Sequence, residues 1–67
     1  MTSKELLLNN ALDSAEQVRE QMRFHLEAGR SALADKFSVE LNKAMNFVSF
    51  VEGLSDKDAD TVKRLLA

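Results

Sequence analysis

Apolar residues recur at steps of three or four positions through the first half of this chain. These residues are Leu8, Ala11, Ala15, Val18, Met22, Leu26, Gly29, Leu33 and Phe37. Because an α-helix completes a turn in about 3.6 residues, this spacing places them on one side of a helix. No segment shows the alternation of period two that a half-buried strand requires. The pattern therefore predicts an all-α fold, and the length predicts one small helical domain at residues 1–67.

Few residues in this chain can stop a helix, since it contains no proline and two glycines. We expect one long amphipathic helix from about residue 3 to residue 52, capped by Thr2 or Ser3. The apolar stripe passes Gly29 without a change of phase. The next residue is Arg30, where a Schellman motif favours an apolar side chain. Both observations favour an unbroken helix, and a bend or break at Gly29, giving a three-helix bundle, is the alternative.

Gly53 and Leu54 predict the end of this long helix. They fit a Schellman motif in which Leu54 folds back onto the last helical turn. Ser55 then caps a short second helix from about residue 56 to residue 66. Because the link is tight, we expect this helix to pack on the Phe47–Val51 region.

Charged residues flank the apolar stripe. Arg19, Arg23 and Arg30 each follow a glutamate by three positions, a spacing that stabilises a helix by roughly 0.2–0.5 kcal/mol per pair. Asp60 lies three positions before Lys63 and four before Arg64, so it can pair with both. The three arginines are also the best candidates for contact with phosphates, but the adjacent glutamates largely neutralise them. A salt-bridged flank is the favoured interpretation.

The segment Phe37–Leu54 carries a wider apolar arc than one neighbouring helix can cover, and it holds three of the four phenylalanines. A long amphipathic helix in so short a chain needs a partner for stability. We therefore expect a helical bundle formed by self-association, most simply as a twofold dimer. The residues predicted to mediate self-association are Leu8, Val18, Met22, Leu26, Leu33, Phe37, Leu41, Phe47, Val48 and Val51.

Phe24 projects from nearly the opposite side of the predicted helix. Packing of another helix against Phe24 is the favoured explanation, and docking of a partner is the alternative. With Arg19, Arg23 and Arg30 it forms the candidate surface for a partner.

No motif that carries chemistry can be assembled from the sequence. The chain has no cysteine, and its one histidine, His25, has no second metal ligand three or four positions away. There is no nucleophile–base pair and no phosphate-binding loop. We therefore predict no enzyme, no metal and no cofactor. No apolar run approaches the length of a membrane span, so we expect a cytoplasmic chain without membrane contact.

These observations predict a non-catalytic protein–protein interaction module. It would self-associate through its helices and act as an adaptor, an assembly or scaffold factor, or an inhibitor of another protein. The alternative is a small dimeric helical regulator that binds nucleic acid along the Arg19, Arg23 and Arg30 edge. No motif ties the chain to a known family.

Overall fold

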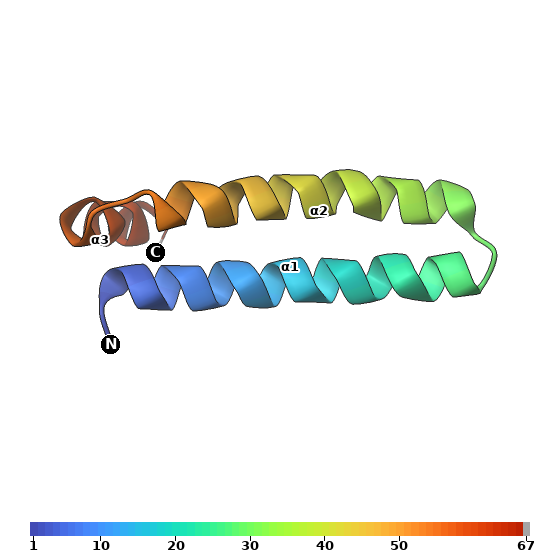
Figure 1. The fold of residues 1–67 in the computed structure, drawn as a ribbon, viewed down its shortest axis with the longest axis horizontal. Coiled ribbons are helices and arrows are strands. Elements are labelled where there is room, and N and C mark those ends of the chain that lie inside the picture. Colours follow the sequence, from blue (N-terminus) through green and yellow to red (C-terminus); the bar gives the residue numbers. More distant parts are fainter. Residues whose placement is uncertain (67) are drawn as a thin grey trace.

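Three α-helices make up nearly all of the chain (Figure 1). The computed structural model describes residues 1–66. Its helices are α1 (Ser3–Glu27), α2 (Ser31–Glu52) and α3 (Asp56–Leu66), and this range contains no strand. The all-α prediction is confirmed. The Thr2 hydroxyl accepts the N–H of Glu5 at 3.1 Å, so the predicted cap at the start of α1 is confirmed as well.

The helices α1 and α2 lie side by side as an antiparallel hairpin, with the turn at residues 28–30 at one end (Figure 1). The molecule measures 44 Å along the hairpin and 19 × 18 Å across it. An unbroken helix of fifty residues would be about 75 Å long. The break at Gly29, which was the alternative in the sequence-based prediction, is therefore the arrangement that the chain adopts, and the expected unbroken helix is not formed.

Gly29 forms the turn because its φ of 77° lies in the left-handed region, where a side chain is disfavoured. The Arg30 N–H donates to the His25 carbonyl at 2.8 Å, and the Gly29 N–H donates to the Leu26 carbonyl at 3.1 Å. These two hydrogen bonds define a Schellman motif. An apolar residue usually closes this motif against the last helical turn. Here the Arg30 guanidinium does so, 5.6 Å from the centroid of the Phe24 ring, which is a cation–π distance.

Replacing Gly29 with alanine should destabilise the hairpin by about 1–2 kcal/mol, the cost of a left-handed backbone in a residue with a Cβ. Nothing lies within 4 Å of a Cβ built at Gly29 apart from its own chain neighbours, so no clash with another part of the fold adds to this cost. Gly53→Ala is the matched control, because Gly53 has φ −82° and its added Cβ would make only ordinary contacts. That change should leave the free energy of unfolding unchanged or raise it by about 0.4–1 kcal/mol. Urea unfolding followed by circular dichroism measures the free energy of unfolding of both variants. Equal changes in the two variants would contradict the left-handed turn at Gly29.

The link between α2 and α3 begins at Gly53, as predicted, but its geometry differs from the prediction. Gly53 has right-handed φ and ψ values, so the Schellman motif expected there is wrong. Leu54 nevertheless packs back against the core. The Ser55 hydroxyl accepts the N–H of Asp58 at 3.2 Å, which confirms Ser55 as the cap of α3.

The seam between α1 and α2 is rich in alanine. Its buried and half-buried residues alternate at steps of three and four, the heptad spacing of a coiled coil. They are Leu8, Ala11, Ala15, Val18, Met22 and His25 in α1, and Ala34, Phe37, Leu41, Ala44, Val48 and Val51 in α2. Because the turn separates two independent helices, the seam need not follow the stripe of one continuous helix. His25 and Ala34 take the places that the sequence stripe gave to Leu26 and Leu33, which are 55% and 40% exposed.

The helix α3 folds back at the open end of the hairpin and packs mainly against α1 (Figure 1). Ala59 of α3 and Val51 of α2 are fully buried there, and Leu7 of α1 completes the cluster. Four half-buried residues surround it: Leu8, Phe47, Leu54 and Val62. The predicted packing of α3 near Phe47–Val51 is confirmed, with Leu7 as an additional partner that the sequence stripe omitted.

Candidate interaction surfaces

Most of the large apolar side chains of this protein are not buried by its own fold. Within residues 1–66 the core consists of seven residues, and four of them are alanines. Ten large apolar side chains are 38% or more exposed. They are Met1, Leu12, Phe24, Leu26, Leu33, Val39, Met45, Phe50, Leu65 and Leu66. Exposed apolar side chains that gather into patches mark sites of contact with other molecules.

Eight of the ten residues predicted to mediate self-association are used inside one chain. Val48 and Val51 are buried, and the other six are half-buried: Leu8, Val18, Met22, Phe37, Leu41 and Phe47. Leu26 and Leu33 remain exposed. The hairpin thus uses most of the apolar stripe, and a second chain would meet the side chains that the hairpin leaves uncovered.

One group of exposed apolar residues follows a long side of the hairpin. Leu12 of α1 and Met45 of α2 line the same shallow hollow, which has a volume of about 280 Å³. Leu26 is fourteen positions from Leu12, two heptads along α1, and therefore lies on the same side. We call Leu12, Leu26 and Met45 the lateral strip. The remaining residues that line the hollow are Ala15, Glu16 and Arg19.

A second apolar depression lies where the C-terminal half of α3 meets the hairpin. It has a volume of about 370 Å³ and is open to solvent. Leu7 and Phe47 belong both to this depression and to the core cluster, so its floor continues the core. We call it the α3 groove. Its lining consists of Leu7, Asn10, Ala11, Ser14, Ala44, Phe47, Lys63 and Leu66.

The arginines of the predicted partner surface do not share one helix. Arg19 and Arg23 are exposed on α1, whereas Arg30 lies in the turn. The Arg30 guanidinium stacks on Phe24, and its Nη1 lies 3.2 Å from Nδ1 of His25. Phe24 is exposed, so the expectation that another helix packs on it is wrong, and one face of its ring is covered by this cation.

The salt-bridged flank expected along α1 is not formed. Ion pairs among residues 1–66 join Glu40 to Lys43 at 3.4 Å and Asp60 to Arg64 at 2.7 Å. Exposed pairs of long side chains gain little in water, because holding both in one geometry costs side-chain entropy. The pairs that the spacing suggested but the structure lacks are Glu16–Arg19, Glu20–Arg23 and Glu27–Arg30.

His25 is a packing residue at the tip of the hairpin. Its ring stacks on Phe37 with centroids 5.2 Å apart and planes 11° apart, and meets the edge of Phe24 at 5.4 Å. In the described part of the chain, no three His, Cys, Asp or Glu side chains lie together in a group that could hold a metal ion.

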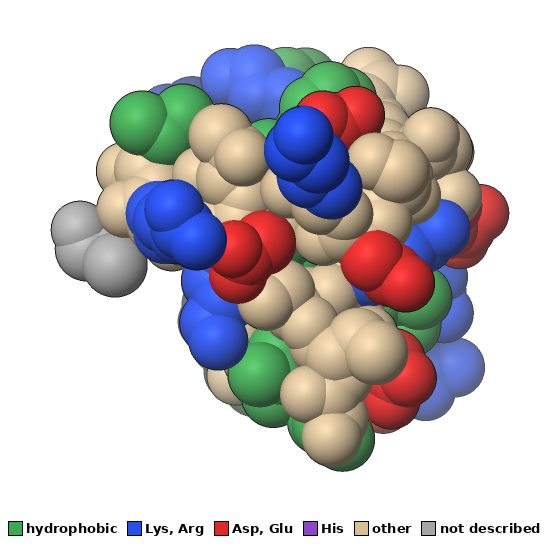
Figure 2. All heavy atoms as spheres, turned by 90° about the vertical axis from the view of Figure 1, so that its left-hand side faces the viewer, with side chains coloured by type: hydrophobic (Ala, Val, Ile, Leu, Met, Phe, Trp, Pro, Cys, Tyr) green, Lys and Arg blue, Asp and Glu red, His purple; other side chains and the backbone are tan. Residues whose placement is uncertain are grey.

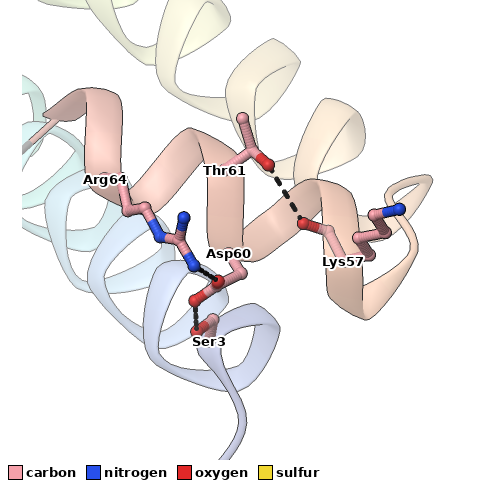
Figure 3. Close-up of polar contacts among 5 residues, drawn as sticks. All are labelled: Ser3, Lys57, Asp60, Thr61 and Arg64. Carbon is pink, nitrogen blue, oxygen red and sulfur yellow. Dashed lines mark hydrogen bonds and ion pairs between the residues drawn. The ribbon is translucent and has the colours of Figure 1, made fainter.

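A polar contact fastens α3 to the start of α1 (Figure 3). The Ser3 hydroxyl donates to Oδ1 of Asp60 at 2.9 Å, and the Arg64 guanidinium donates to Oδ2 at 2.7 Å. These contacts favour the ionised carboxylate, so the pKa of Asp60 lies below its ordinary value, with the Ser3 hydrogen bond as the largest cause. The predicted Asp60–Arg64 pair is confirmed, whereas the predicted Asp60–Lys63 ion pair is not formed within residues 1–66. Seen end-on, this end of the molecule carries acidic and basic side chains intermixed with apolar ones (Figure 2).

Ser3→Ala should raise the pKa of Asp60 toward its ordinary value. Because the folded pKa is lowered, the contact stabilises the fold at pH values above the unfolded pKa of about 3.9, and this stabilisation is lost as the pH falls through the folded pKa. NMR titration of the Asp60 carboxyl carbon measures the shift. Ser14→Ala, a change of an exposed hydroxyl on the same helix, should leave the titration unchanged. An unchanged midpoint in Ser3→Ala would show that the hydroxyl does not hold the carboxylate in solution.

Comparisons with known proteins identify no relative: no family model, curated protein or solved structure matches the chain. Among residues 1–66, no helix is long and apolar enough to cross a membrane. Function is therefore inferred from the surfaces that the chain itself presents.

Proposed function

We propose that this chain is a non-catalytic protein–protein interaction module that self-associates and binds another protein. The observation that supports this proposal is the contrast between a small, alanine-rich core and ten exposed large apolar side chains. A domain of this size buries only about 60% of the surface of its unfolded chain. Contact with a second chain would add apolar burial that the fold alone does not supply.

We place the self-association surface on the lateral strip. Leu12 and Met45 are exposed side by side on different helices, and Leu26 extends the strip toward the turn. Arg19 lies between Leu12 and Leu26 on α1, where its aliphatic stem adds apolar contact area while its charged end stays in water. Two hairpins that pack along this side would form a four-helix arrangement. Adaptor, assembly or scaffold factor, and inhibitor are the roles that suit such a module.

Light scattering coupled to size exclusion, over a hundredfold range of protein concentration, tests this proposal. The wild-type mass should rise to that of a dimer, and Leu12→Glu should return it to that of a monomer, because the change places a charge in the strip. Val39→Glu is the matched control, since Val39 is exposed on α2 outside the strip. Both variants should keep their helical circular dichroism. A wild-type chain that stays monomeric throughout, or equal effects of the two variants, would contradict the proposal.

The alternative of nucleic-acid binding has one favourable observation, which is that Arg19 and Arg23 form no ion pair within residues 1–66. Against it, Arg30 is engaged by Phe24 and His25. The net charge of the chain is also −2. Binding of duplex DNA or RNA at low salt that disappears in Arg23→Glu would favour the alternative, whereas binding that is absent or unaffected would exclude it.

A further inference from the structure

We propose that the α3 groove binds an acidic amphipathic helix of a partner protein. The proposal rests on the proposed function and adds the site and the chemistry of the partner.

The shape of the groove suits a helix. Leu7 and Phe47 give it an apolar floor that is continuous with the core, and α3 forms one wall of it through Leu66. An amphipathic helix binds such a groove by inserting side chains spaced three and four residues apart. The groove is open to solvent, so the polar face of a bound helix would remain in water.

The charge in the groove selects an acidic partner. Among residues 1–66, the lining contains one charged side chain, Lys63, and two other polar side chains, Asn10 and Ser14. Lys63 forms no ion pair within residues 1–66, although its charge contributes to lowering the pKa of the nearby Asp60 carboxylate, which Ser3 and Arg64 contact directly. The Lys63 ammonium can therefore still meet a carboxylate from the partner. Charges of this kind contribute mainly to specificity and to the rate of association.

The same charge disfavours a second copy of this chain in the groove. Two copies related by a twofold axis through the groove would bring Lys63 toward the Lys63 of the other copy. Like charges facing each other across an interface are unfavourable. The lateral strip shares no residue with the α3 groove, so it stays available for self-association. One chain can therefore contact a second copy and a different protein at separate sites.

Two synthetic helical peptides test this proposal on the 67-residue chain. Both carry leucines at positions i, i+3, i+4 and i+7, and they differ only in having Glu or Lys beside this row. Amide chemical shifts of the ¹⁵N-labelled protein should change on adding the Glu peptide at Ala11, Ser14, Ala44, Phe47 and Lys63. The Lys peptide should bind about fivefold more weakly, a ratio that corresponds to one surface charge pair.

Charge reversal at Lys63 provides the decisive comparison. Lys63→Glu should reverse the preference, so that the Lys peptide binds more tightly. Lys43→Glu is the control, because Lys43 is exposed on α2 outside the lining and should not change the preference. An unchanged preference in Lys63→Glu, shift changes confined to the lateral strip, or no shifts at millimolar peptide would each overturn the groove proposal. If the wild-type mass still rises with concentration in that case, the proposed self-association stands without the groove.

Discussion

Val51→Asp should unfold the protein. Val51 is fully buried where α1, α2 and α3 meet, and it packs with Leu7 and Ala59. The core within residues 1–66 contains no buried polar or charged residue, so a carboxylate there would find no partner. Burying an unpaired polar group costs about 2–7 kcal/mol, and a charge costs more. At 0.05–0.15 kcal/mol per residue, a chain of this length has a total stability of about 3–10 kcal/mol.

Far-UV circular dichroism and urea unfolding measure this effect. Val39→Asp is the matched control, because it makes the same change on the same helix at a position that is 54% exposed. Its free energy of unfolding should stay within about 0.5 kcal/mol of the wild-type value. A Val51→Asp chain that remains folded, with a cooperative transition like that of the control, would show that the three helices do not meet at Val51.

Leu7→Ala should be the most destabilising leucine truncation in α1, at about 2–5 kcal/mol. Leu7 is buried under α3, in contact with the Val51 and Ala59 cluster, and the alanine would leave a cavity that this small core cannot readily fill. Leu12→Ala is the control, since Leu12 lies in the same helix but is 44% exposed. It should cost less than about 1 kcal/mol in the monomer.

Urea unfolding at low protein concentration measures the two leucine variants without a contribution from self-association. Similar losses at Leu7 and Leu12 would contradict the packing of α3 on α1. A loss at Leu7 accompanied by early exchange of α3 amides would show that α3 separates before the hairpin unfolds.

The positions of most helix ends follow from local chemistry, which is why the sequence predicts them. Thr2 and Ser55 cap α1 and α3 through hydrogen bonds between residues three apart. The turn at Gly29 depends on a more specific contact. An arginine after the glycine argues against a Schellman motif on average, but Arg30 closes this one by stacking on Phe24. The spacing of apolar residues in the sequence cannot predict that cation–π contact.

The interaction surfaces are less predictable than the helices because they depend on how the helices pack. The sequence stripe includes Leu8, whereas the fold buries Leu7 and leaves Leu8 half-buried. The seam likewise takes in His25 and Ala34 and leaves Leu26 and Leu33 exposed. The α3 groove combines residues of three helices, and only the placement of α3 brings Lys63 close to Leu7 and Phe47. The periodicity of residues along one helix therefore cannot predict the α3 groove.

An isotope-filtered NOE experiment on a mixture of ¹³C-labelled and unlabelled chains tests whether the chain self-associates through the lateral strip while its hairpin stays intact. It separates contacts between chains from contacts within one chain. We predict intermolecular NOEs at the methyl groups of Leu12, Leu26 and Met45, and exclusively intramolecular NOEs between Ala11 and Ala44. Intermolecular NOEs between the two alanines, or none at the lateral strip at concentrations where the mass is that of a dimer, would contradict this prediction.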